Sequence, residues 1–170
     1  HKSMQEIAVG SKVNVNVNWQ RRYDHMQQHS GQHLISAVFR NELNTPTMSW
    51  WMSEYPKSSQ IEMKLQRDEE KERKITDADI ERCEAIINEA ISAGKAMTVH
   101  VFHDQASIDS FSASNPRFQS KTLPQGAGPL RVVEIPGIEY NTCCGTHLSS
   151  TSELQMVKIV SWDTVNNEVL

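Results

Sequence analysis

The chain has 170 residues, enough for one domain with a hydrophobic core. Its net charge of -4 at pH 7 argues against a dedicated nucleic-acid-binding domain, because such domains are usually basic. No apolar stretch approaches the roughly 20 residues that a membrane span needs, and the first residues hold no apolar leader. Three cysteines, an odd number, argue against a disulfide framework. We therefore expect a globular cytoplasmic protein with no membrane partner.

The first predicted elements are a strand and a long helix. Val13 to Val17 alternate with asparagines, which predicts a half-buried strand. This strand would belong to residues 1–20, interpreted as an N-terminal strand or the remnant of a missing upstream domain. Asp24 followed by Gln27 resembles a capping box and predicts a helix from there to about Asn41.

The rest of the chain mixes strands and helices without a regular βαβ rhythm. Further strands are predicted over residues 47–52, 60–65, 97–102, 130–135 and 155–160. One helix is predicted to begin with a capping box of Thr76 and Asp79 and to end with a C-cap at Gly94, with a buried face of Ile80, Cys83, Ile87, Ala90 and Ile91. A short helix is predicted from Asp104 to Phe111. Residues 112–128 form a long polar loop, which is often functional in a compact domain. This order favours an α+β fold with a mostly antiparallel sheet packed against helices.

A first spacing typical of metal ligands lies in the predicted long helix. His29-Ser-Gly-Gln-His33 places two imidazoles four residues apart, one turn apart on the same helix face. His25 lies one turn earlier, but each four-residue step drifts by about 40° around a helix of 3.6 residues per turn. All three histidines therefore do not easily share one ion. We choose His29 and His33 as ligands and keep His25 as an outer or RNA-facing group.

The second spacing, Cys143-Cys-Gly-Thr-His147, pairs a thiolate with an imidazole around a glycine that permits a tight turn. Cys143 and Cys144 compete as the sulfur ligand, and only Cys143 matches the four-residue spacing to His147. Cys144 is interpreted as a small buried residue. Imidazole and thiolate ligands together favour zinc. Ser30 stands where an H-E-x-x-H metalloprotease carries its glutamate base, so that chemistry is not expected. A site assembled from such distant segments favours an enzyme.

The two motifs, residues 25–33 and 143–147, together resemble the alanyl-tRNA editing proteins. These are free-standing relatives of the editing domain of alanyl-tRNA synthetase and, more distantly, of threonyl-tRNA synthetase. The resemblance covers roughly residues 13–160 and implies a ThrRS/AlaRS-type editing domain over residues 21–170. It implies zinc-dependent, ATP-independent trans-editing, in which mischarged tRNA(Ala), chiefly Ser-tRNA(Ala) and also Gly-tRNA(Ala), is hydrolysed. The implied zinc ligands and catalytic residues are His29, His33, Cys143 and His147, of which His147 can act as ligand, proton shuttle or both.

The implied selectivity requires a pocket that hydrogen-bonds the serine hydroxyl, which alanine lacks. In the predicted strand, Thr45, Thr47 and Ser49 fall on one face by period two. Our hypothesis is that Thr47 or Ser49 reads this hydroxyl, and that Gln32 supports the pocket. The four tryptophans, among them Trp50, are interpreted as core or domain-interface residues. The cations expected to contact tRNA phosphates are Arg21, Arg22, Arg117, Lys121 and Arg131.

Two other functions fit the same metal pattern. One is a zinc-dependent hydrolase of a small ester or amide, and the other is a domain that binds RNA or a partner protein around a structural zinc. Removing the metal discriminates between them, because a structural zinc site unfolds on chelation, whereas a catalytic site loses turnover and keeps much of its fold. The sequence leaves the oligomeric state open.

Overall fold

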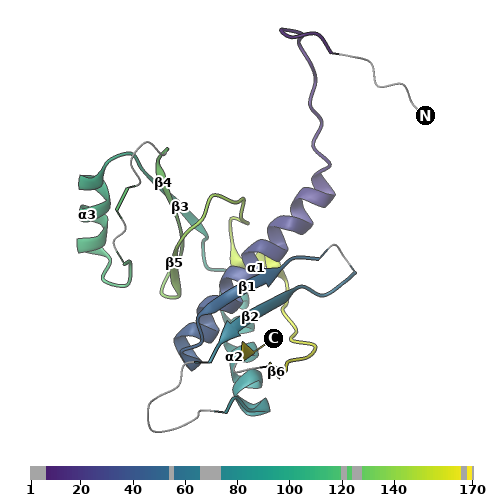
Figure 1. Cartoon of the computed structure of the whole chain (residues 1–170), viewed down its shortest axis with the longest axis vertical. Coiled ribbons are helices and arrows are strands. Elements are labelled where there is room, and N and C mark those ends of the chain that lie inside the picture. The colour runs from purple at the N-terminus through teal and green to yellow at the C-terminus, as the bar shows by residue number, and fades with distance from the viewer. Residues whose placement is uncertain are drawn as a thin grey trace.

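The computed structural model describes residues 7–53, 56–65, 74–119, 122–123, 128–165 and 168–169. Within them the chain has an α+β fold with antiparallel strands, as expected from the sequence (Figure 1). The helices are α1 (Trp19–Leu43), α2 (Asp77–Ser92), α3 (Gln105–Ser114) and the short 3-10 helix η1 (Thr151–Leu154). The strands are β1 (Thr47–Trp51), β2 (Gln60–Lys64), β3 (Thr98–Phe102), β4 (Leu130–Ile135), β5 (Glu139–Thr142), β6 (Thr164–Val165) and β7 (Glu168–Val169).

Helix α1 is the long central element of the fold and carries the first histidine pair. It begins earlier than expected because Asn18, and not Asp24, caps it: the Asn18 side chain accepts a hydrogen bond from the Arg21 backbone N–H at 3.1 Å. It ends at Asn44, which adopts the left-handed conformation at φ 56° and donates its N–H to the Arg40 carbonyl. The helix therefore extends beyond the predicted range at both ends.

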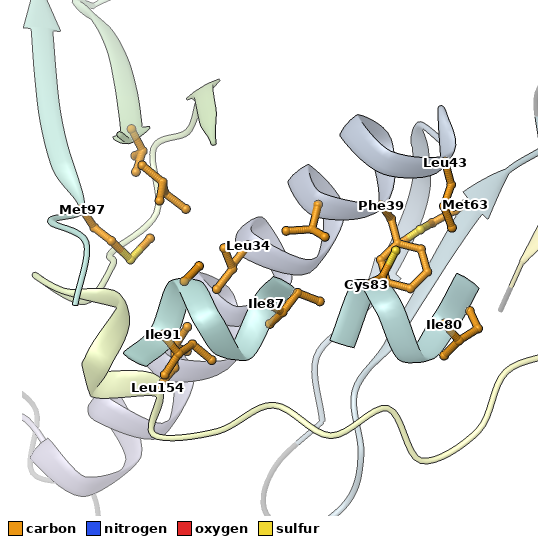
Figure 2. Packing of buried hydrophobic residues seen from close by; sticks show 14 of the residues in the cluster. Leu34, Phe39, Leu43, Met63, Ile80, Cys83, Ile87, Ile91, Met97 and Leu154 are labelled. Carbon is orange, nitrogen blue, oxygen red and sulfur yellow. The ribbon is translucent and has the colours of Figure 1, made fainter. Parts of the chain in front are cut away.

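The main hydrophobic core lies between α1 and α2 (Figure 2). The predicted capping box of Thr76 and Asp79 begins α2, and its predicted apolar face is buried. Leu34 of α1 and Ile87 of α2 are both completely buried at this interface. Burying such a side chain contributes about 1.5–3 kcal/mol, so this contact fixes α1 firmly in place.

The strands form two separate antiparallel sheets; in Figure 1, β1 and β2 are drawn across α1, and β3, β4 and β5 lie to its left. The first has the order β1-β2-β7-β6, and β2 packs into the main core through Met63. The second has the order β3-β4-β5 and packs against α3 through a smaller cluster that includes Phe102, Ile108 and Phe118. A turn at Pro136 and Gly137 joins β4 to β5.

Two predicted strands are wrong. Residues 13–17 form no strand, and no described strand pairs with them; their valines lie exposed ahead of α1. Residues 155–160 are also not a strand, because their backbone bonds to side chains of α2 instead of a neighbouring strand. Asn88 bonds both the N–H and the carbonyl of Val157, and Glu84 accepts the Ile159 N–H. Among the described helices, none is long and apolar enough to cross a membrane.

Candidate metal centre

The fold brings both predicted ligand pairs to one place. His29 and His33 lie one turn apart on α1, and Cys143 and His147 lie in the turn that follows β5. One ligand atom from each of the four residues lies within 4.8 Å of the other three. The Cys143 Sγ is 3.4 Å from His29 Nε2 and 3.5 Å from His147 Nε2. Segments separated by most of the chain therefore share a single cluster.

This cluster matches the donor set and the size of a zinc site. Zinc bonds of about 2.0–2.1 Å to nitrogen and 2.3 Å to sulfur place neighbouring ligands of a tetrahedral shell about 3.3–3.6 Å apart. The two sulfur–nitrogen separations fall within this interval. Three imidazoles and one thiolate are a donor set that suits zinc. The four side chains could thus hold a metal ion, with all four ligand atoms within 4.8 Å of one another.

Hydrogen bonds to the outer ring nitrogens aim two of the histidines. His29 Nδ1 lies 3.0 Å from the Thr146 carbonyl, which can only accept a proton, so Nε2 keeps its lone pair for an ion. His147 Nδ1 lies 3.3 Å from the hydroxyl of Ser30. That hydroxyl also accepts the Leu148 backbone N–H at 3.0 Å, which ties helix α1 to the second motif.

The environment keeps these imidazoles neutral, as metal binding requires. Burial, reinforced by nearby His33, His29 and Arg131, lowers the pKa of His147 to about 3. Burial also lowers the pKa of His29, although the hydrogen bond to the Thr146 carbonyl acts in the opposite direction. Two of the four donors therefore remain unprotonated at neutral pH without help from a metal.

The turn that carries Cys143 and His147 has two local supports. The Arg131 guanidinium donates hydrogen bonds to the carbonyls of Cys143 at 2.6 Å and Gly145 at 2.7 Å. Gly145 packs directly on the ring of His29: a Cβ at this position would lie 2.3 Å from His29 Cε1. The glycine of the second motif is therefore required for close approach to the first motif, beyond the tight turn expected from the sequence.

Comparison with known proteins identifies relatives of the whole chain. Residues 130–169 match the family described as "Threonyl and Alanyl tRNA synthetase second additional domain". The chain is 36% identical over 161 residues to the Alanyl-tRNA editing protein Aarsd1 of Danio rerio, covering 94% of this chain and 35% of that protein. The mouse protein of the same name is 37% identical over the same shares.

The chain is a relative of the alanyl-tRNA editing proteins. The Putative alanyl-tRNA editing protein alaX of Saccharomyces cerevisiae is also 32% identical, over an alignment of 178 positions that covers 95% of this chain and 36% of that protein. The resemblance expected from the two motifs is thereby confirmed. The chain spans about a third of the length of these relatives.

One expectation for the strand predicted to read the serine hydroxyl is wrong: Thr47 and Ser49 do not share a face. Thr47 pairs with Met63 and Ser49 pairs with Glu62, with a bulge between the two pairs. Paired residues share a face of a sheet, and consecutive residues such as Glu62 and Met63 face opposite sides. Thr47 and Ser49 therefore lie on opposite faces, and the Ser49 hydroxyl donates a hydrogen bond to Glu62.

The face of Thr47 is the one that meets the metal centre. Trp50 pairs with Ile61, which lies two residues from Met63, so Trp50 and Thr47 share a face. The Trp50 ring lies 6.5 Å from the His29 ring, measured between centroids. Trp50 is 49% exposed, so of its two predicted placements, core or domain interface, the core is wrong. It forms an aromatic wall beside the cluster that the sequence did not predict.

The remaining predicted site residues differ in their surroundings. Gln32 is half-buried on α1 and donates to the Ser36 hydroxyl at 3.1 Å. Arg21 and Arg22 are exposed in the first turn of α1, and Arg117 is exposed with its guanidinium bonded to the Gly137 carbonyl. His25 is exposed, and so is Cys144, which was expected to be buried. Lys121 lies outside the described residues.

The sequence did not predict two polar residues that lie near the Nδ1 atom of His33. Glu139 and Asn141 lie on β5 two residues apart, so they share a face, and Cys143 continues the same alternation beyond the strand. Glu139 Oε2 and Asn141 Nδ2 each lie 3.5 Å from His33 Nδ1. The shared face of Glu139, Asn141 and Cys143 can be recognised only if β5 is predicted as a strand. The four residues of β5 are polar or aromatic, so no apolar alternation predicts it.

Proposed function

We propose that the chain is a cytoplasmic zinc-dependent deacylase that hydrolyses mischarged tRNA(Ala), chiefly Ser-tRNA(Ala) and also Gly-tRNA(Ala). The observation that carries this proposal is the convergence of His29, His33, Cys143 and His147 within 4.8 Å. The names of the relatives support the substrate, since they are alanyl-tRNA editing proteins. These relatives are about three times longer than the chain, so the proposal concerns what this segment does by itself.

The aminoacyl ester of a charged tRNA is an activated bond, and a bound zinc ion supplies a Lewis acid beside it. The residues of the chain hold and shape this site. Thr146 and Ser30 fix the orientation of His29 and His147, and Arg131 holds the turn around Cys143. The exposed face of Trp50 borders the cluster and offers an apolar surface to the end of the substrate.

Discrimination between serine and alanine is assigned to Thr47. Its hydroxyl lies on the sheet face that Trp50 presents to His29, whereas Ser49 faces away and is already bonded to Glu62. A hydroxyl that pairs with the serine side chain is left unpaired by alanine, which disfavours the correctly charged tRNA. Thr47→Val should therefore slow hydrolysis of Ser-tRNA(Ala), and Ser49→Val provides the matched control on the opposite face. Equal rates for both variants and the wild type would remove Thr47 from this role.

Contacts to tRNA phosphates are assigned first to Arg21 and Arg22. Both are exposed at the start of α1, which is also the helix that carries His29 and His33. Arg117 is a further exposed candidate on the side of β5. Arg131 is less suited, because its guanidinium already bonds two carbonyls of the metal turn. Neutralising Arg21 and Arg22 should flatten the dependence of tRNA binding on salt.

The decisive experiment compares hydrolysis of Ser-tRNA(Ala) with that of Ala-tRNA(Ala), with and without a chelator, for the wild type and Cys143→Ala. We expect the wild type to release serine and spare alanine, and both chelation and Cys143→Ala to abolish release. Circular dichroism on the same samples reports whether the fold persists. Release that continues at the same rate in Cys143→Ala would contradict the proposed site.

One observation favours a second function, in which zinc is purely structural and the chain only binds RNA. Four protein donors complete a tetrahedral shell, and closed shells are typical of structural zinc sites. A catalytic ion would require one ligand to leave or the shell to expand, and His147 is the ligand considered for both roles. The structural function would be favoured if the metal-bound protein shows no hydrolysis and if its helical circular dichroism signal is lost when the metal is removed.

A further inference from the structure

Glu139 is a buried carboxylate directly behind the metal centre. The residue is 4% exposed and lies on the inward face of β5, where it pairs with Ile135 of β4. A buried carboxylate is costly unless other groups bond both of its oxygens. Each of its two oxygens is therefore expected to have a hydrogen-bond partner.

The two oxygens have different surroundings. Oε1 accepts a hydrogen bond from the Arg40 guanidinium at 3.0 Å, which supplies a compensating positive charge. Oε2 lies 3.5 Å from His33 Nδ1 but makes no hydrogen bond of good geometry to any described residue. The one nearby ring nitrogen belongs to a member of the ligand cluster, so a small rotation of His33 would satisfy the oxygen.

We propose that Glu139 is a positioning residue that accepts the Nδ1 proton of His33 and so directs the Nε2 lone pair of His33 at the metal. Asn141 Nδ2 lies 3.5 Å from His33 Nδ1 but can only donate, and a bond from it would require the Nδ1 lone pair and place the ring proton on Nε2; the proposed arrangement therefore excludes that bond. The carboxylate is therefore the proton acceptor within reach. A carboxylate–histidine–metal arrangement of this kind fixes the ring nitrogen that binds the ion and strengthens binding.

This inference depends on the proposed metal centre, and its test measures metal affinity in place of turnover. The informative variant is Glu139→Gln, which keeps the shape of the side chain. Arg40 can only donate, so it selects the amide oxygen of the glutamine and leaves the amide nitrogen toward His33. That nitrogen donates to Nδ1 and forces the ring proton onto Nε2, where it blocks metal binding.

The experiment titrates zinc into the wild type and the variant in competition with a chromophoric chelator, and records cobalt absorption in parallel. Loss of such an outer partner typically costs 10–100-fold in affinity, and we expect a decrease of this size for Glu139→Gln. We also expect weaker cobalt bands as one imidazole leaves the shell. Glu134→Gln is the matched control: Glu134 bonds His100 Nε2 at 2.7 Å, away from the cluster, so zinc affinity should be unchanged.

A double variant separates positioning from general damage. In Arg40→Met/Glu139→Gln nothing selects the amide orientation, so the glutamine can turn its oxygen to His33 and part of the zinc affinity should return. A purely structural role of Glu139 predicts further loss in the double variant. Equal zinc affinity of wild type and Glu139→Gln would overturn this proposal alone, whereas a wild type without zinc affinity would overturn the metal centre as well. If Glu139→Gln does not fold, Glu139→Asp tests the same contact, because the shortened carboxylate no longer reaches His33.

Discussion

Replacing Gly145 with alanine tests the central claim that the two motifs form one metal centre. A Cβ at position 145 would lie 2.3 Å from His29 Cε1 and 2.9 Å from His29 Nδ1. Ordinary van der Waals contacts begin at about 3.4 Å, so the ring or the turn must retreat by about 1 Å. The methyl group added at position 145, two residues after Cys143 of the second motif, would therefore displace the ring of His29 of the first motif.

The structure gives the size of the effect. Metal–ligand distances in a well-formed site tolerate deviations of about 0.2 Å, several times less than the displacement required here. His29 cannot simply turn away, because its Nδ1 is bonded to the Thr146 carbonyl in the same turn. We expect Gly145→Ala to weaken zinc binding at least tenfold, which corresponds to about 1.4 kcal/mol. Hydrolysis of Ser-tRNA(Ala) should decrease in parallel at limiting zinc.

The assay is competitive zinc titration, with thermal unfolding measured on the metal-free protein. Gly128→Ala is the matched control, because a Cβ at position 128 would meet no atom of the described residues within 4 Å. We expect the control to bind zinc like the wild type. If Gly145→Ala also binds zinc with wild-type affinity, His29 does not approach the turn as described, and the shared centre is refuted.

Three further predictions concern the supports around this centre. Hydrogen bonds, chiefly from Ser149, lower the pKa of Glu153, so its stabilising effect is present above its ordinary pKa and is lost as the pH falls from about 5 through the lowered value. Glu153→Gln should keep the capping hydrogen bonds but lose the titrating charge, so it should flatten the acid side of a urea-unfolding series, and an unchanged pH profile would contradict this. Arg131→Met removes both hydrogen bonds to the carbonyls of Cys143 and Gly145, so zinc affinity should decrease in the absence of RNA; wild-type affinity would contradict a role of Arg131 in holding the metal turn. Ile87→Ala should lower the free energy of unfolding by 2–5 kcal/mol in denaturant, and a loss below about 1 kcal/mol would contradict the core described here.

The elements that the sequence predicted correctly are those with local signals. The sequence predicts helix α2 by its capping box at Thr76 and by the spacing of its buried residues, and it predicts β4 over the same residues, 130–135, that the strand occupies. The strand predicted at residues 13–17 has an ideal alternation, yet alternation alone provides no partner strand. Strand β5 was missed for the opposite reason: Glu139 and Asn141 occupy its inward positions, where apolar residues are expected.

The same distinction applies to the site. The four clustered residues were predicted because each pair has a spacing of four, which is a property of the sequence itself. The groups that orient these four residues, such as Arg131 and Glu139, come from other parts of the chain, so no local sequence pattern predicts this role. The bulge in β1 is equally invisible in the sequence, and it alone separates Thr47 from Ser49. Sequence spacing predicted which residues meet, and tertiary contacts decide how they are aimed.

The cluster is held together by contacts that require no metal, and this bears on whether the ion is catalytic or structural. The buried hydroxyl of Ser30 accepts the Leu148 N–H, and Gln27 of α1 donates to the Glu153 carbonyl at 2.7 Å. Both contacts join α1 to the segment after the second motif, and Arg131 holds the intervening turn. A structural zinc site typically supplies the free energy that folds its ligands together. Here hydrogen bonds of Ser30, Gln27 and Arg131 also join these segments, so we expect chelation to abolish hydrolysis while the helical signal persists.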